Sequence, residues 1–257
     1  MDQIVTIQSY RYGPDGIEPA EIPVVAEYHV SFLLNGRPFL VVACCGSDLA
    51  EMAAGHLLAE GIVKSRTDIE RIDVDEDSRT VDVITGKGAD MFGRLVRVRT
   101  LVSGCAGGGG VVCPPRRDEL PRVRPEAVTS AMKDFLGLST TYRRTHGVHS
   151  AALYDLEGSL LAFNDELGRH NAVDKLIGTA LFKGLSLERA MLLTTGRVAS
   201  EILTKAAVAG VPVLASRAAP TSIAVAMARA ANLMLLTGVT ARGFYIHHGR
   251  ECLAVDS

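Results

Sequence analysis

One cysteine set among glycines is the residue of this sequence whose surroundings best suit chemistry. Residues 103–110 read SGCAGGGG, so five glycines surround Cys105. Glycine lets the backbone turn sharply and lets another group approach closely. Backbone N–H groups exposed in such a loop stabilise anions, and a thiolate is an anion. The loop indicates a thiol displayed for reaction, although taken alone it fits a plain linker equally well.

A second group of chemistry-bearing residues follows two predicted strands. Residues 194–201 leave one strand and enter a helix, and residues 215–221 leave the next strand and enter another helix. Ligands of layered α/β sheets bind beyond the carboxyl ends of the strands, near helix N-termini. Each segment combines a hydroxyl, an arginine and free N–H groups, which suits phosphate. Helix capping explains either segment alone, whereas two in succession favour a binding site that includes Arg197, Ser200, Ser216, Pro220 and Thr221.

The densest polar cluster is residues 165–175, with the sequence DELGRHNAVDK. His170 and Asp174 are four residues apart, so they share one face of the predicted helix. Arginine and lysine suit phosphates, and a carboxylate accepts hydrogen bonds from a donor-rich base edge such as that of guanine. The alternative is a solvated helix start with ion pairs along it. The candidate binding residues are Asp165, Arg169, His170, Asn171, Asp174 and Lys175, with Glu166 as a further carboxylate.

Two histidines just upstream raise the question of a metal site. His146 and His149 are three residues apart, and Cys105 and Cys113 add two thiols. A closed zinc site usually draws on paired ligands at short spacing, such as C-x-x-C, and these cysteines are eight residues apart. The zinc deaminase signature, H-x-E with P-C-x-x-C, is absent from the sequence. We therefore expect no metal site and place both histidines in the binding region.

Composition limits the class of protein. The 257 residues are 47% hydrophobic and 22% charged, as in a globular protein with a substantial core. A net charge of −2 gives no general attraction for nucleic acid or an acidic membrane surface. No apolar run is long enough to span a bilayer, and the N-terminus lacks a secretory signal. Five cysteines, two of them adjacent, argue against a disulfide framework, so we expect a cytoplasmic protein.

The first part of the chain reads as a small α+β unit that positions the thiol loop. Residues 24–34 and 38–43 flank Asn35-Gly36, the preferred dipeptide of a type I′ hairpin turn. A helix is predicted after Ser47-Asp48, ending near Gly61. Residues 69–74 and 80–84 form a second predicted hairpin, and a strand over 94–102 leads into the Cys105 loop. A proline- and charge-rich connector over 113–121 then marks a boundary, which predicts one domain over 1–118.

Beyond the connector, residues 119–257 are predicted to form an α/β domain. A helix over 125–135 precedes a hairpin of residues 150–154 and 159–163 that turns at Gly158. Helices starting at Asn171, Ser200 and Thr221 then alternate with apolar strands over 191–194, 211–214 and 233–236. This alternation predicts helical layers on a partly parallel sheet.

The motifs named so far resemble one protein family. Residues 145–152 (THGVHSAA), 165–175 (DELGRHNAVDK), 195–201 (TGRVASE) and 219–221 (APT) are similar to those of the FdhD/NarQ family, in the same order and spacing. The similarity reaches back through Glu60-Gly61 to the N-terminal hairpin, so it covers nearly the whole chain. The resemblance implies a three-layer C-terminal domain of cytidine-deaminase-like fold without the deaminase zinc, together with a smaller N-terminal α+β domain.

The same resemblance implies a function. Members of the family are formate dehydrogenase accessory sulfurtransferases. The resemblance implies that Cys105 receives sulfur as a persulfide from a cysteine desulfurase and passes it to the molybdenum cofactor bis(molybdopterin guanine dinucleotide), Mo-bis-MGD. The catalytic subunit of formate dehydrogenase then receives the sulfurated cofactor. A homodimer is also implied, and we expect GDP to mimic each guanine dinucleotide arm. The family's cofactor-binding segment near the C-terminus maps onto Phe244, Tyr245, Ile246, His247, His248 and Gly249.

One position departs from the family pattern. The family carries C-x-x-C in the central loop, and Gly108 stands here where the second cysteine is expected. This supports a persulfide on Cys105 and leaves open any mechanism that needs two neighbouring thiols, with Cys113 as a distant second. The alternative function is a chaperone that binds the molybdenum cofactor without sulfur chemistry. A nucleotide hydrolase is a third interpretation, which lacks a visible metal-ligand set or a nucleophile–base pair.

Overall fold

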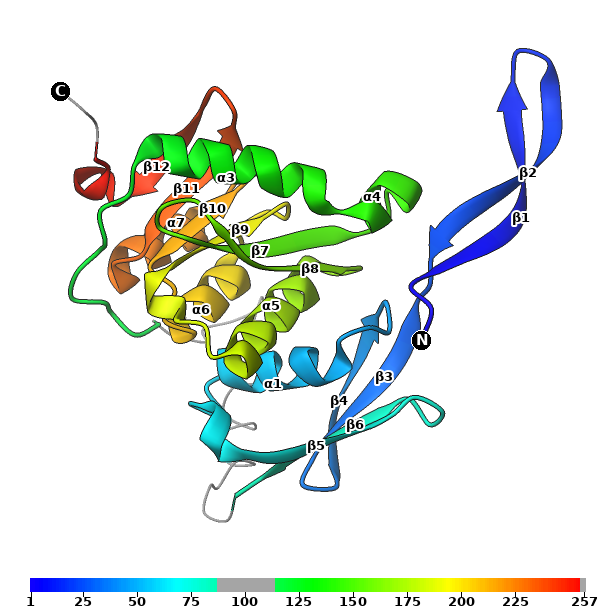
Figure 1. Cartoon of the computed structure of the whole chain (residues 1–257), viewed down its shortest axis with the longest axis horizontal. Helices are drawn as coiled ribbons and strands as arrows, with labels where there is room; N and C mark the ends of the chain where they lie inside the picture. The colour runs from blue at the N-terminus through cyan, green and yellow to red at the C-terminus, as the bar shows by residue number, and fades with distance from the viewer. Residues whose placement is uncertain (87–113, 255–257) are drawn as a thin grey trace.

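The computed structural model describes residues 1–86 and 114–254, which form a mixed α/β fold (Figure 1). Three sheets are present among these residues: a hairpin of two strands, a sheet of four and a sheet of six. The hairpin pairs β1 (Ile4–Gly13) with β2 (Gly16–Val25) and extends away from the rest of the molecule in Figure 1. This hairpin was not predicted from the sequence.

The four-stranded sheet and one helix make up the N-terminal α+β unit. Its strand order is β4-β3-β6-β5, with β3 at Tyr28–Leu34, β4 at Arg37–Cys44, β5 at Ile69–Asp75 and β6 at Thr80–Thr85. Asn35 and Gly36 turn the first hairpin with φ values of 53° and 74°, as a type I′ turn requires. Helix α1 (Leu49–Ala59) follows β4, and its buried side chains cover the sheet. The two predicted hairpins and the helix are confirmed.

The six-stranded sheet has the order β12-β11-β10-β9-β7-β8. Strands β9 (Ala190–Thr194), β10 (Val213–Ser216) and β11 (Met234–Thr240) are parallel, whereas β7 (His149–Asp155), β8 (Leu160–Glu166) and β12 (Gly243–His248) run antiparallel to their neighbours. Helix α3 (Pro125–Leu138) covers one face. Helices α5 (Arg169–Lys183), α6 (Ser200–Val208) and α7 (Ser222–Ala231) cover the other. The predicted partly parallel sheet is confirmed, and the cytidine-deaminase-like arrangement stays a prediction.

The two units share one hydrophobic core. Helix α1 of the N-terminal unit packs directly on α5, as Figure 1 shows. A Cβ on Gly55 of α1 would lie 1.8 Å from the backbone oxygen of Asp174, so the helices meet at their backbones. This contact needs glycine because any side chain would force the helices apart. The division into domains over 1–118 and 119–257 stays a prediction. Residues 114–124, which include the predicted boundary, contain no helix or extended strand.

Three predicted details differ from the structure or fall outside it. The short helix α4 (Thr140–Thr145) follows α3 and was not predicted. Residues 244–248 lie in strand β12 (Gly243–His248), whereas the sequence indicated only a binding segment there. The predicted strand over 94–102 lies outside the described residues, as do Cys105, Gly108 and Cys113. No helix among the described residues is long and apolar enough to cross a membrane.

Candidate functional site

A pocket of about 520 Å³ opens at the end of the six-stranded sheet where β9 and β10 finish. This volume is in the usual range for small-molecule sites, roughly 300–1,000 Å³. Its wall comes from α3, α4 and the strand ends. The lining residues are Phe135, Leu136, Ser139, Tyr142, His146, Gly147, Val148, His149, Ser150, Leu167, Thr195 and Arg217.

The topology explains why these distant residues meet. Strand β7 is antiparallel to β9, so its first residue, His149, lies at the edge where β9 ends. Strand β8 is antiparallel to β7, and its last residue, Glu166, pairs with His149. Carboxyl ends of parallel strands and amino ends of antiparallel strands therefore share this edge, where α/β proteins bind ligands. The predicted binding residues His146 and His149 are brought together with the end of β9.

Hydroxyl groups fix the floor of the pocket. Thr195 Oγ1 accepts a hydrogen bond from the Ser150 N–H at 3.0 Å and lies 3.4 Å from His149 Nδ1. Asp165 accepts from Ser139 Oγ and from Ser150 Oγ, both at 2.6 Å. Two charge-assisted hydrogen bonds hold the Asp165 carboxylate in place. Asp165 is thus tied to two residues that line the pocket.

Arg169 lies near two half-buried histidines of this region, His149 and His170. Its side chain packs on the backbone of Gly196, where a Cβ would lie 2.6 Å from Arg169 Cβ. Burial and the nearby Arg169 guanidinium both lower the pKa of His149 and of His170. His170 Nε2 also lies 3.0 Å from Glu201 Oε2. Arg169 Nε is buried and has no hydrogen-bond partner among the residues that the structure describes.

The two predicted phosphate loops are joined to each other. Val198 forms a bridge with Pro220, donating its N–H to Ala219 O at 3.1 Å and accepting from the Thr221 N–H at 2.9 Å. The buried Ser216 hydroxyl donates to Gly196 O at 2.7 Å. Neither α5 nor α6 has a side-chain cap, so their N-terminal N–H groups lack that partner. This arrangement can attract an anion at the sheet edge.

The polar side chains of these loops are either exposed or placed at the start of a helix. Arg197 and Arg217 are exposed, and Arg217 lines the pocket. Ser200 is half-buried at the first position of α6. Thr221 caps α7 by accepting from the Ala224 N–H, which is the ordinary capping that the sequence left open.

Asp174 and Lys175 point into the junction of the two units rather than into the pocket. Asp174 accepts from Lys205 Nζ at 2.7 Å and lies 3.1 Å from His56 Nδ1 of α1. Lys175 pairs with Glu166 at 2.6 Å, with neither side chain exposed. Burial by itself would raise the pKa of the Asp174 carboxyl, but Lys205 and His56 together outweigh burial, so this pKa is lowered. Both residues stay predicted binding residues, but in this conformation they hold the fold together.

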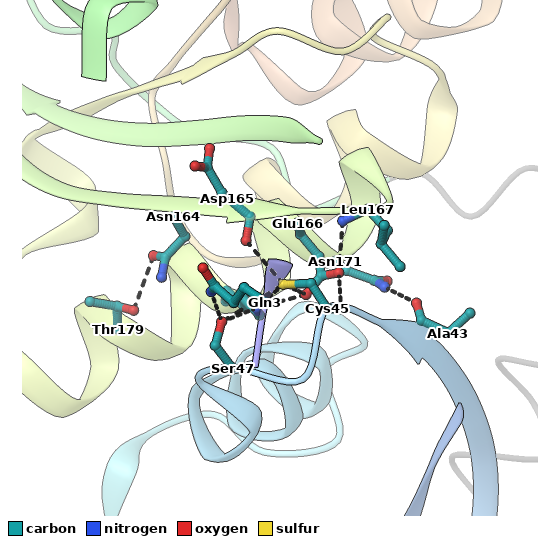
Figure 2. Close-up of polar contacts among 11 residues, drawn as sticks. Gln3, Ala43, Cys45, Ser47, Asn164, Asp165, Glu166, Leu167, Asn171 and Thr179 are labelled. Carbon is teal, nitrogen blue, oxygen red and sulfur yellow. Dashed lines mark hydrogen bonds and ion pairs between the residues drawn. The ribbon is translucent and has the colours of Figure 1, made fainter. Parts of the chain in front are cut away.

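A buried thiol, that of Cys45, also contacts Lys175, and Figure 2 shows this cysteine beside Ser47 and Glu166. Cys45, in the turn after β4, places its Sγ 3.2 Å from Glu166 Oε2 and 3.4 Å from Lys175 Nζ. Its N–H donates to Glu166 Oε1 at 2.8 Å, and Ser47 Oγ accepts from Lys175 Nζ at 3.0 Å. Cys45 was not predicted as a functional residue, because nothing in the local sequence distinguishes it from Cys44. Asn171, a predicted binding residue, donates to the backbone oxygen of Ala43 at 2.9 Å.

The predicted C-terminal binding segment lies on a different part of the sheet. Strand β12 is three strands away from β9, which is about 14 Å at the usual spacing. His247 Nε2 lies 2.7 Å from Thr237 Oγ1, and His248 Nε2 lies 2.9 Å from Asn232 Oδ1. In the same segment Tyr245 and Ile246 are exposed, Phe244 is half-buried and Gly249 is buried. The structure does not bring this segment into the pocket.

His146 lies at the rim of the pocket. It ends α4 in the left-handed conformation, with φ 53°, and its ring meets Tyr142 edge-on at 5.1 Å between centroids. No group of three or more metal-ligating side chains occurs among residues 1–86 and 114–254. An aromatic side chain beside imidazole and guanidinium groups suits a planar, anionic ligand.

The chain is similar over most of its length to one protein family and to a related crystal structure. The model of the FdhD/NarQ family matches residues 25–254. The sulfur carrier protein FdhD of Bacillus subtilis is 32% identical over 256 residues, covering 96% of both chains. The protein of the same name from Streptomyces avermitilis is 33% identical over 251 residues, covering 90% of this chain and 89% of its own. A crystal structure of a protein from Desulfotalea psychrophila, named as a formate dehydrogenase accessory protein, superposes with a TM-score of 0.81 at 25% identity, covering 98% of this chain and 100% of that one.

Proposed function

The chain belongs to the FdhD/NarQ family, and on this premise we propose that it is a sulfur carrier that serves the maturation of formate dehydrogenase. Its similarity to proteins named sulfur carrier protein FdhD extends over nearly the whole length of both chains. In this proposal Cys105 carries the sulfur as a persulfide, a cysteine desulfurase supplies it, and Mo-bis-MGD is the cargo that receives it. The protein acts as a homodimer in the cytoplasm and hands the cargo to the catalytic subunit of formate dehydrogenase.

The observation that supports Cys105 as the sulfur-carrying residue is that the pKa values of Cys44, Cys45 and Cys252 are all raised. Burial raises the pKa of Cys44 to about 11. Burial also raises the pKa of Cys45, and burial with the nearby Glu251 raises that of Cys252. A thiol with a raised pKa is mostly protonated at neutral pH and is a poor nucleophile. All three described cysteines are thus unsuited to sulfur transfer, which supports Cys105 in its glycine-rich segment.

The first step exchanges one sulfur–sulfur bond for another. The Cys105 thiolate attacks the outer sulfur of the desulfurase persulfide, a new S–S bond forms, and the desulfurase cysteine leaves as a thiolate. In the second step that outer sulfur moves to molybdenum and the Cys105 thiolate is regenerated. Turning the transferred sulfur into a sulfido ligand takes two electrons, which reduced molybdenum supplies on going from Mo(IV) to Mo(VI).

In this proposal the pocket binds one guanine dinucleotide arm of the cargo. Arg217 lines it, Arg169 Nε lacks a partner among the described residues, and the uncapped start of α6 lies beside the joined loops. A pyrophosphate carries charge that these groups stabilise. Among the carboxylates predicted to read guanine, Glu166 and Asp174 are enclosed by lysines, so we assign Asp165 to that role.

Intact-mass analysis tests the sulfur-transfer step. The protein is incubated with a cysteine desulfurase and cysteine, and we expect a mass increase of one sulfur atom that peptide mapping places on Cys105. A reductant should remove it, and Cys105→Ala should show no increase. If the native protein gains no sulfur, or gains it equally in Cys105→Ala, Cys105 is not the carrier. A chaperone that only binds the molybdenum cofactor then becomes the better interpretation.

A further inference from the structure

The cluster of Cys45, Glu166 and Lys175 has no part in the chemistry proposed above, and it lies beside the pocket. Cys45 is 1% exposed, and Glu166 and Lys175 have no exposed surface. Removing an ion pair from water costs several kcal/mol per ion in a real protein, so good geometry is needed to retain one. The 2.6 Å contact between Lys175 Nζ and Glu166 Oε2 meets that requirement.

Cys45 supplies two of the contacts that keep the Glu166 carboxylate in one position. Its N–H donates to Oε1 at 2.8 Å, and its Sγ lies 3.2 Å from Oε2. Burial is the main cause that raises the pKa of the Cys45 thiol, so it stays protonated and donates to the carboxylate. The Leu167 N–H also donates to Oε1, at 2.7 Å. Glu166 is therefore fixed both by the N-terminal unit and by the residue that follows its own strand.

Strand geometry connects this carboxylate to the pocket. Successive side chains of a strand point to opposite faces, so Asp165 and Glu166, at the end of β8, face opposite ways. Figure 2 shows the Asp165 carboxylate directed away from Cys45, whose Sγ lies 3.9 Å from the Asp165 backbone oxygen. Asp165 then holds Ser139 and Ser150 of the pocket wall. Leu167, the next residue, lines the pocket itself.

We propose that Cys45 is a positioning residue: through Glu166 it fixes residues 165–167 and so sets the shape of the pocket wall from the opposite face of the sheet. The ligand-binding part of this inference rests on the proposed function; the positioning part does not. The N-terminal unit thereby contributes to a pocket whose lining residues all come from the C-terminal part of the chain.

The test compares two neighbouring cysteines. Cys45→Ala removes the thiol donor, whereas Cys44→Ala makes the same truncation at a buried residue whose side chain packs in the hydrophobic core. Cys45→Ser keeps a donor near Glu166. For each variant, hydrogen–deuterium exchange is measured for the Leu167 amide and for a peptide covering residues 147–151, and GDP affinity is measured by calorimetry.

Only Cys45→Ala should speed exchange at Leu167 and over 147–151, by about tenfold, the factor that corresponds to ~1.4 kcal/mol. It should also weaken GDP binding, and Cys45→Ser should restore most of both. Equal changes in Cys44→Ala and Cys45→Ala would overturn the inference and leave Cys45 as a core residue. If GDP binds none of the proteins but the exchange pattern is as expected, the positioning role holds and the pocket's proposed ligand is wrong.

Discussion

Gly55 of α1 and Gly178 of α5 pack reciprocally against each other's helix. A Cβ on Gly55 would lie 1.8 Å from Asp174 O, and a Cβ on Gly178 would lie 1.8 Å from Glu51 O. Helix backbones touch here with no side chain between them. This contact brings His56 within 3.1 Å of Asp174 and aligns the buried charges of the two units.

Gly55→Ala or Gly178→Ala should therefore destabilise the protein. Overpacking a core typically costs about 1–3 kcal/mol, and a clash with backbone is at the upper end because no side chain can move aside. Gly137→Ala is the control, since Gly137 lies in α3 with open space around its Cβ position. That change should be neutral or stabilising, because alanine suits a helix better than glycine. Urea unfolding measures all three, and equal stability of the three variants would contradict the close helix contact.

Local sequence patterns predicted the elements that depend on local rules. The Asn35-Gly36 turn, Gly158 between β7 and β8, and the helix entry at Thr221 follow from backbone preferences of those residues. Alternating helices and apolar strands predicted the partly parallel sheet. The start of α5 was placed two residues late because Arg169 and His170 carry no helical apolar signal.

Long-range contacts could not be predicted from the sequence. Residues 165–175 showed many charged types together, but nothing local revealed that Lys175 turns toward Cys45 while Asp165 turns toward Ser150. These partners are more than a hundred residues away in the first case and come from a neighbouring strand in the second. Burial decides whether a lysine contacts a ligand or an internal carboxylate, and burial is a property of the assembled fold.

The Lys175–Glu166 pair yields a second prediction. Lys175→Met leaves a buried carboxylate with no cation beside it, which typically costs about 3–5 kcal/mol. Lys175→Met combined with Glu166→Leu should recover part of that loss, because no unpaired charge remains. Thermal and urea unfolding of the single and double variants provide the measurement. A single variant with native stability but weaker GDP binding would instead place Lys175 on the ligand, as the sequence pattern first suggested.

GDP binding should depend on the exposed arginines around the pocket. Charge-assisted contacts are worth roughly 1.5–3 kcal/mol, so Arg217→Ala should weaken GDP by about tenfold or more. Arg197→Ala should weaken it too, whereas Arg250→Ala, on the exposed 3₁₀ turn at Arg250–Cys252, should not. ADP should bind less well than GDP, because the Asp165 carboxylate accepts from guanine donors that adenine lacks. Equal affinity for both nucleotides in calorimetry, or an equal effect of Arg250→Ala, would remove the nucleotide from this pocket.

Proton uptake should accompany nucleotide binding. Burial and Arg169 lower the pKa of His149 and of His170 below the ordinary value of 6.5, so both imidazoles are neutral in the free protein at neutral pH. A bound phosphate favours the charged imidazolium and raises these pKa values. The complex then binds more protons than the free protein, and affinity should increase as the pH falls from about 8 to about 6.

Calorimetry in buffers of different ionisation enthalpy measures this uptake directly. His149→Gln should reduce it, and His29→Gln, an exposed site on β3, should leave it unchanged. The same lowered pKa values predict that the free protein loses stability as the pH falls through the ordinary histidine range, because the unfolded chain then binds protons that the folded chain does not. Affinity that is constant with pH, or that falls on acidification, would show that no anion sits beside these histidines.

The two cysteines that lie outside the described residues should differ in their effect on function. Cys105→Ala should abolish maturation of formate dehydrogenase, measured as formate oxidation in cells that depend on the variant, because it removes the sulfur-carrying group. Its melting temperature and GDP affinity should match those of the native protein, which excludes a folding defect. Cys113→Ser should keep much or all of the activity, since Cys113 is eight positions along the chain from Cys105 and Gly108 occupies the position of a vicinal thiol. If Cys113→Ser is as inactive as Cys105→Ala, both thiols relay the sulfur. If Cys105→Ala supports full activity, the protein delivers the cofactor without transferring sulfur.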